Sequence, residues 1–349
     1  MLRGLVKKVL ILTPASLITQ WQEELKTKFN LDFKNHQEIT DWETSNLVIA
    51  LLPAWAVSIF YFGLPVIVLT LVSVATCLLA EYLIQRFMLK GKPTISDGSA
   101  VITGMLLAFN VPASLPFWML MIGAFVAIAI AKMPFGGLGK NPFNPALVGR
   151  VFMLISFPVQ MTTWPKPTPI WNFGADVVTG PTPLGILKEG VKNGQHVDAL
   201  MGEMPSYVDM LLGQMGGSFG EVSAIAILIG AIFLLIRKVI TWEIPVSFIL
   251  TAFLFSGIFY LVDPTMYANP CFHLVSGGLM LGACFMATDM VTSPTSRWGM
   301  IVFGFGCGIL TILIRLFGAY PEGVSFAILI MNALVPLINK GFKPKTYAK

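Results

Sequence analysis

The segment with the clearest chemical potential is DVVTGPTPLG, which begins at Asp176 and contains Thr179, Gly180 and Thr182. The hydroxyl of Thr182 can form a phosphodiester, and such a bond would fix a flavin mononucleotide (FMN) to the chain. Gly180 permits a tight turn, and the prolines around Thr182 hold it extended and remove N–H groups that would otherwise bond its side chain. We therefore expect an accessible Thr182, with Thr179 bonding locally to shape the loop. An ordinary turn is the alternative.

A second polar motif, GGLGKNPFNPALVGR, occupies residues 136–150. It is not a phosphate-binding P-loop, because Lys140 is followed by Asn141 rather than by Ser or Thr. The amides of Asn141 and Asn144 offer donors and acceptors at a helix start, which suits the edge of a flavin ring. A structural helix cap is the alternative.

Two acids lie at the ends of apolar segments and are candidates for an ion pathway. Asp289 closes one segment and Glu322 begins another, and an acid at membrane depth is functional by default. The alternatives are a solvated, idle Asp289 and a Glu322 that complements a helix N-terminus. Arg150 is expected to extend to the cytoplasmic surface.

The composition identifies an integral membrane protein. Of 349 residues, 55% are hydrophobic and 12% are charged, about half the charged share of a soluble domain. The net charge of +5 therefore concerns membrane orientation rather than nucleic acid. The four cysteines form no CxxC pair and the three histidines do not cluster, so no metal or haem site is expected. Cys284 and Cys307 are expected to be packing residues.

Ten apolar segments are long enough, or nearly so, to cross a bilayer. They cover roughly 46–63, 64–88, 98–112, 115–133, 145–161, 220–237, 243–262, 273–290, 298–318 and 322–339. The third and eighth are rich in glycine and end in turns that contain proline. Residues 104–118 align with residues 282–298, which suggests that the two halves of five segments each are related. Because five is an odd number, the second half enters the membrane in the opposite orientation, and the halves are expected to be inverted repeats. The expected fold is all-α, polytopic and similar to urea transporters.

The distribution of Lys and Arg predicts the orientation. Lys132, Lys140, Arg237 and the basic tail fall on one side, whereas Arg315 and a few lysines fall on the other. The more basic side is cytoplasmic. Both termini are therefore expected in the cytoplasm, and the Thr182 loop on the outer side of the membrane.

This topology predicts five regions. They are an atypical cytoplasmic extension (1–45), a first membrane repeat (46–161), an outer loop that carries FMN (162–219), a second repeat (220–340) and a basic tail (341–349). Within the extension, VLILTPASLITQWQEEL looks similar to a strand and helix of helicase-like ATPases. No Walker lysine accompanies it, so an irregular extension or a wrong gene start is expected.

From about residue 46 to 345 the chain resembles the family that contains the D subunit of the Rnf ferredoxin:NAD oxidoreductase and the B subunit of the Na⁺-translocating NADH:quinone reductase. The matching motifs are LLPAW, GGLGKNPFNPALVGR, the threonine motif and FMATDMVTSP. The chain length and the short outer loops favour the Rnf member. In this family a flavin transferase attaches FMN to the last threonine of D-x-x-[ST]-G-A-T. That position is Thr182 here, and Pro181 stands where alanine is usual.

The resemblance implies an electron-carrying flavoprotein, formally also a phosphoprotein, in a complex that translocates Na⁺ or H⁺. Its partners would be the A, B, C, E and G subunits of Rnf, the flavin transferase and membrane lipid, and it would be inactive alone. A second, non-covalent flavin (riboflavin) would lie by the motif at 136–150. A quinone-reductase member of the family, like the B subunit, and a passive channel for a small neutral solute are the alternatives.

Overall fold

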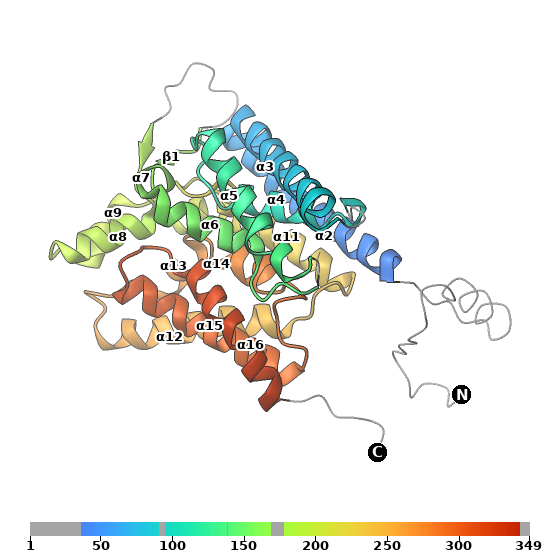
Figure 1. The fold of residues 1–349 in the computed structure, drawn as a ribbon. Coiled ribbons are helices and arrows are strands. Elements are labelled where there is room, and N and C mark those ends of the chain that lie inside the picture. The colour runs from blue at the N-terminus through green and yellow to red at the C-terminus, as the bar shows by residue number, and fades with distance from the viewer. Residues whose placement is uncertain (1–35, 91–94, 138, 169–177, 343–349) are drawn as a thin grey trace.

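The computed structural model describes residues 36–90, 95–137, 139–168 and 178–342, and within these the protein is almost wholly helical (Figure 1). One antiparallel pair of short strands, β1 (Trp164–Pro165) and β2 (Thr179–Gly180), accompanies the helices in the described part. The expected all-α class is confirmed. Asp176 and the first 35 residues lie outside the described residues.

Among the described residues, six helical stretches are long and apolar enough to cross a membrane, so the chain is a multi-pass membrane protein. They contain α2 (His36–Phe62), α3 (Leu64–Leu83) with η2 (Ile84–Met88), α5 (Phe117–Ala129) with η4 (Met133–Phe135), α12 (Glu243–Val262), α15 (Arg297–Phe317) and α16 (Val324–Gly341). Helix α2 continues without interruption across the expected boundary at residue 45.

The other expected segments are shorter or broken. Three apolar helices have fewer residues than a full crossing needs: α4 (Ser99–Phe109), α6 (Pro145–Ser156) and α11 (Ala224–Ile236). The eighth segment is divided into α13 (Pro270–Val275), α14 (Leu279–Leu281) and the π-helix η6 (Gly282–Met286). Gly277 adopts a φ of +64° at the break, a conformation that favours glycine.

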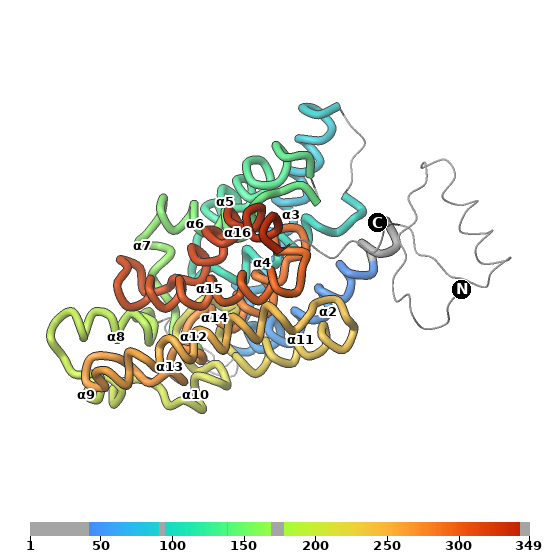
Figure 2. Tube along the Cα trace, turned by 90° about the horizontal axis from the view of Figure 1, so that it is seen from below, coloured from blue at the N-terminus to red at the C-terminus, as the bar shows by residue number. Residues whose placement is uncertain are grey.

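The region between α6 and α11 is more structured than the long polar loop that the sequence suggests. It contains α7 (Pro158–Met161), α8 (Pro183–Lys192), α9 (Val197–Glu203), α10 (Tyr207–Leu212) and the 3₁₀ turn η5 (Phe219–Glu221). Leu184, Leu187, Leu200 and Met210 form a small separate core with Phe272 of α13. Figure 2 shows α8, α9 and α10 gathered beside α13 at one end of the molecule. The loop is therefore docked on the membrane helices.

Glycines allow close approach where membrane helices pack, as is usual in a bilayer. Gly230 of α11 lies against the backbone of Ala50 in α2, and Gly308 of α15 lies against Thr251 and the Phe248 carbonyl of α12. A methyl group at Gly308 would approach the Phe248 carbonyl oxygen to 2.9 Å. These contacts join α2 to α11 and α12 to α15.

A buried ion pair fixes the start of α4. Lys132 Nζ lies 2.7 Å from Glu81 Oε2 and donates to Ser99 Oγ at 2.6 Å. Asp97, in the 3₁₀ turn η3 (Ile95–Asp97), accepts from the backbone N–H of Ser99 at 2.8 Å. Lys132 lies in the turn between α5 and η4, but it is 1% exposed rather than free on a loop surface, because Glu81 and Ser99 hold it inside.

Arg315 is a second buried cation, and it lies beside the segment that is divided into α13, α14 and η6. It belongs to α15 rather than to an outer loop, and it is buried, which corrects the expectation. Its guanidinium donates to the carbonyl oxygens of His273 at 2.6 Å and Ser276 at 3.0 Å. A cation at these carbonyls complements the C-terminus of α13.

We expect Gly230→Ala to destabilise the protein by about 1–3 kcal/mol, because the new methyl group would overlap the Ala50 backbone. Thermal unfolding in detergent measures the change. Gly202→Ala in α9 is the matched control, since no atom lies within 4 Å of the added Cβ there. Equal melting temperatures for the two variants would contradict the packing described.

We expect Lys132→Met to cost about 3 kcal/mol or more, because it leaves the Glu81 carboxylate buried without its cation. The exposed Lys140 provides the control, and Lys140→Met is expected to change stability by less than about 0.5 kcal/mol. The double variant Glu81→Gln/Lys132→Met should recover part of the loss. No recovery in the double variant would show that the pair is not coupled.

Candidate functional site

Thr182 lies at the N-terminus of α8 and is the N-cap residue of that helix. Its backbone is extended, with φ −70° and ψ 160°, as predicted. The predicted accessibility is wrong, because Thr182 is only 3% exposed. The prediction that its hydroxyl has no local hydrogen bond is also wrong. The N–H of Gly185, beyond both prolines, donates to Thr182 Oγ1 at 3.1 Å.

The rest of the threonine motif forms part of the strand pair. Thr179 and Gly180 of β2 lie opposite Pro165 and Trp164 of β1. Gly180 is therefore paired in a strand rather than in the tight turn expected, and its φ is not positive. Thr179 is exposed. The pairing leads the chain directly into the N-cap position of α8.

A small cavity of about 30 Å³ lies against Thr182. Trp164 and Tyr320 contribute aromatic rings to its wall, and Arg150 and Glu322 contribute charged groups. The cavity thus brings together a hydroxyl, a guanidinium and the positive end of a ten-residue helix. The N-terminus of the helix favours an anionic group on the hydroxyl oxygen, while the Arg150 guanidinium is already shared by Glu221 and Glu322.

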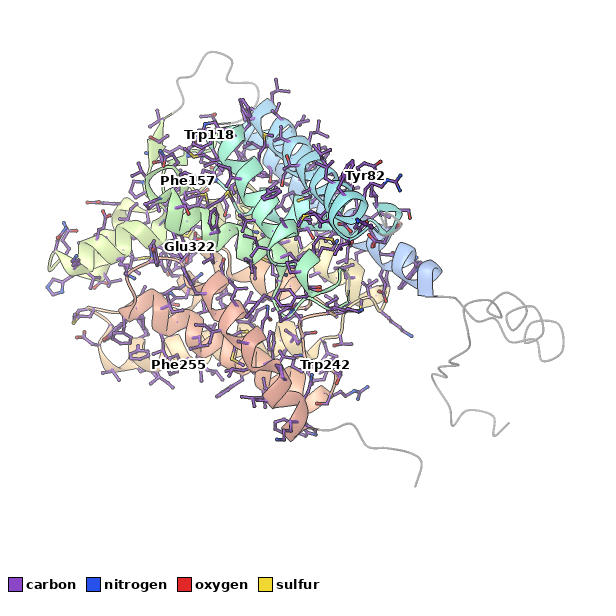
Figure 3. All side chains as sticks on the ribbon, viewed as in Figure 1. Tyr82, Trp118, Phe157, Trp242, Phe255 and Glu322 are labelled. Carbon is purple, nitrogen blue, oxygen red and sulfur yellow. The ribbon has the colours of Figure 1, made fainter. Side chains whose placement is uncertain are left out.

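Arg150 is buried at the centre of an ionic cluster. Its Nη2 contacts Glu322 Oε2 and lies 3.5 Å from Glu221 Oε1, and its Nη1 donates to Ser325 Oγ at 2.7 Å. Figure 3 shows Glu322 near the middle of the molecule. The expectation that Arg150 reaches the cytoplasmic surface is therefore wrong. Glu322 directly precedes Gly323, the N-cap residue of α16, and its side chain makes no cap hydrogen bond with that helix. Its carboxylate pairs with Arg150 instead.

Lys188 connects α8 to the end of α15 by hydrogen bonds. Its Nζ donates to the carbonyl oxygens of Tyr320 at 2.7 Å, Arg315 at 3.2 Å and Ile314 at 3.4 Å. Partial burial lowers the pKa of Lys188. The helix that begins at Thr182 is thereby held beside the residues that lead to Glu322.

A larger cavity of about 250 Å³ is lined by the second motif and the end of the broken segment. Asn141, Asn144 and Lys132 contribute polar groups from one side, and Thr288 and Asp289 contribute theirs from the residues that follow η6. The structure thus brings two sequence-predicted groups, the motif amides and Asp289, into one site. Lys140 is exposed and is not among the lining residues.

The two motif amides also have structural roles. Asn144 is the N-cap of α6: its Oδ1 accepts from the N–H of Leu147 at 3.3 Å, while its Nδ2 donates to the Met286 carbonyl at 3.3 Å. The helix-cap alternative is confirmed for Asn144. Asn141 Nδ2 donates to the Phe143 carbonyl at 3.0 Å.

Asp289 is half-buried rather than fully solvated. Its two carboxylate oxygens accept from Thr292 Oγ1 at 3.0 Å and from the N–H of Val291 at 3.3 Å. These contacts close the turn after η6 and orient the carboxylate. Cys284 and Cys307 are buried in the main hydrophobic core, which confirms them as packing residues.

The sequence reasoning missed three buried polar residues that contact the buried cations. Glu81 pairs with Lys132, Glu221 approaches Arg150, and the carbonyl of His273 accepts from Arg315. The roles of Lys132 and Arg315 were also missed, because these residues served only to assign topology. Each stands in or beside an apolar run, and an ionisable residue there is a functional candidate by default.

Comparison with known proteins gives a consistent result. Residues 33–348 match the model of the NQR2, RnfD, RnfE family. The D subunit of the proton-translocating ferredoxin:NAD(+) oxidoreductase complex of Clostridium ljungdahlii is 43% identical over 301 residues, which cover 86% of this chain and 89% of that protein.

Two further relatives have names of the same kind. The D subunit of the Na(+)-translocating ferredoxin:NAD(+) oxidoreductase complex of Acetobacterium woodii is 43% identical over 304 residues, 86% of this chain and 89% of the relative. The D subunit of the ion-translocating oxidoreductase complex of Stutzerimonas stutzeri is 40% identical over 323 residues, 87% of this chain and 91% of the relative. The match at this identity over nearly the whole chain leaves one conclusion: the protein belongs to the NQR2, RnfD, RnfE family.

Proposed function

We propose that this chain is the D subunit of an ion-translocating ferredoxin:NAD oxidoreductase complex and carries electrons through FMN bound covalently to Thr182. The observation that carries the proposal is the position of Thr182, at the start of α8 and on a cavity shared with Arg150. The names of the relatives support the enzyme class. As one component of an oxidoreductase, the chain would be inactive alone.

The site suits a phosphodiester in charge and geometry. A phosphate on Thr182 Oγ1 would carry a negative charge at the N-terminus of α8, where the helix dipole favours anions. The Gly185 N–H that now donates to the hydroxyl would be available to a phosphate oxygen. FMN supplies the redox chemistry when attached. The chain's residues position it and keep the linkage in a partly enclosed place.

The cavity of about 250 Å³ is our proposed site for a second, non-covalent flavin such as riboflavin. Its volume is slightly below the range of typical ligand pockets, so it suits a ring system rather than a large dinucleotide. Asn141 and Thr288 offer hydrogen-bonding groups to a ring edge, and Lys132 lines the cavity with its charge already paired to Glu81. Lys140, outside the cavity, is left without a proposed contact.

We infer that the fold consists of ten crossings in two inverted repeats, as in urea transporters. The third segment of the first half is the short helix α4, that of the second half is divided into α13, α14 and η6, and a buried cation contacts each of them. Lys132 bonds Ser99 at the start of α4, and Arg315 bonds the Ser276 carbonyl between α13 and α14. Lys132 follows the end of α5, and Arg315 lies in the last turn of α15. In the proposed repeat, α5 and α15 are equivalent helices of the two halves. The correspondence supports a repeat.

The proposed setting is a bacterial inner membrane, with both termini cytoplasmic and the Thr182 region on the outer side. The partners would be the A, B, C, E and G subunits of Rnf, and a flavin transferase would attach FMN. Asp289 and Glu322 are our proposed carboxylates on the route of Na⁺ or H⁺. The relatives are named for both ions.

A member that resembles the B subunit of Na⁺-translocating NADH:quinone reductase is the second candidate, because the family model includes NQR2. Detection of covalent flavin on Thr182, in the experiment described next, would separate both redox candidates from a passive solute channel. A channel has no use for FMN on Thr182.

We expect Thr182→Ala to abolish covalent flavin, because the acceptor oxygen is lost, while the protein still inserts and assembles. Flavin fluorescence of the denatured protein in a gel, after co-expression with a flavin transferase, measures the linkage. Thr182→Ser should retain a reduced amount, and the exposed Thr179→Ala should retain most of it. Equal covalent flavin in Thr182→Ala and wild type would refute the assignment.

Asn141→Leu should reduce non-covalent flavin by about tenfold, because it replaces a hydrogen-bonding amide on the cavity wall with an apolar group. The measurement is the flavin released when purified protein is denatured, while covalent flavin on Thr182 should stay constant. Asn193→Leu, at an exposed position after α8, is the matched control. Unchanged release from Asn141→Leu would contradict the proposed second site.

A further inference from the structure

The ionic cluster around Arg150 contains more buried carboxylate than contacting cation. Glu221 and Glu322 both approach the same guanidinium nitrogen, Nη2 of Arg150. Arg315 is the other cation nearby, and its hydrogen bonds go to the carbonyl oxygens of His273 and Ser276. The guanidinium of Arg150 is therefore shared by the carboxylates of Glu221 and Glu322.

Three oxygen atoms of these two carboxylates lack a hydrogen-bond donor among the described residues. Both oxygens of Glu221 and Oε1 of Glu322 are buried and accept no hydrogen bond within the described part of the chain. The Glu221 side chain is 1% exposed. The buried Ser218 Oγ, at the N-cap position of η5, makes no hydrogen bond there either. A fully ionised carboxylate without hydrogen bonds is costly to bury.

We propose that the triad of Arg150, Glu221 and Glu322 binds one proton, shared between its two carboxylates. Two carboxylates that approach the same guanidinium nitrogen repel each other, and a proton on either removes that repulsion. In the uptake step an O–H bond of hydronium breaks, its proton forms an O–H bond with one carboxylate oxygen, a water molecule is left, and no electron is transferred. Release reverses it.

Charge and ligand number favour a proton over a metal cation here. Sodium or another metal ion requires several oxygen ligands around it, but two guanidinium groups, of Arg150 and Arg315, face this region. The positions of Gly277 and Gly278 confirm the proximity. A Cβ on Gly277 would lie 3.2 Å from Arg315 Nη2, and one on Gly278 would lie 2.8 Å from Glu221 Oε1. A proton needs only one carboxylate oxygen.

The charged and titratable groups that face the triad come from every element packed around it. Arg150 comes from α6, Glu221 from η5, and Glu322 from the segment before α16. Arg315 of α15 lies beside them, bonded to the carbonyl of the buried His273 of α13. Tyr320 lines the Thr182 cavity, and Lys188 of α8 donates to the carbonyls of Arg315 and Tyr320. The inference goes beyond the flavin proposed for Thr182 and does not depend on it, although Arg150 and Glu322 also line the Thr182 cavity.

Infrared difference spectroscopy on the purified complex tests the proposal. Spectra taken at alkaline and at neutral pH should differ by a carbonyl-stretching band of a protonated carboxylic acid that shifts in heavy water. The band should be lost in Glu221→Gln and in Glu322→Gln, since one remaining carboxylate pairs with Arg150. It should persist in Glu243→Gln, a buried control whose carboxylate lies 3.4 Å from the exposed Arg297.

Glu221→Asp keeps an acid and should give a band at a shifted frequency, which separates loss of the proton site from failure to fold. Assembly of each variant into the complex is checked in parallel. A wild-type band that survives both glutamine substitutions would overturn the proposal. A band removed by Na⁺, but not by choline at equal ionic strength, would overturn it as well, because the site would then bind a metal cation.

Discussion

A charge within a hydrocarbon layer must find its partner inside the protein, and the described part of this chain is organised by that requirement. Lys132 is neutralised by Glu81 and bonds the start of α4. Arg315 bonds the carbonyl oxygens at the end of α13. Lys132 thus holds the first residue of α4 through its side chain, and Arg315 stabilises the backbone where the segment of α13 and α14 is divided.

The same requirement connects the outer region to the membrane helices. Lys188 of α8 binds the carbonyl oxygens at the end of α15, and the next segment brings Glu322 to Arg150 of α6. Thr182 is the N-cap residue of α8, the helix that Lys188 connects to α15. A group attached to Thr182 would therefore lie beside the charges that join α6 to α16. The arrangement links the proposed cofactor site to the core through a short series of contacts.

Much of the architecture follows from apolar segment length, and the corrections follow from contacts between distant residues. The six long helices and the extended Thr182 were predictable from local sequence. The burial of Thr182 was not, because it depends on how α8 packs after folding. Arg150 was misplaced for a similar reason. Its partners, Glu221 and Glu322, follow it by 71 and by 172 residues, separations that no local pattern records.

The central claim is that Thr182 carries a flavin phosphodiester, and peptide mass spectrometry of the native wild-type protein tests it most directly. We predict that the peptide containing Thr182 is heavier than its sequence by FMN less one water, and that fragmentation places the added mass on Thr182. An unmodified Thr182 peptide from protein made together with an active flavin transferase, or the same mass located on Thr179, would contradict the account.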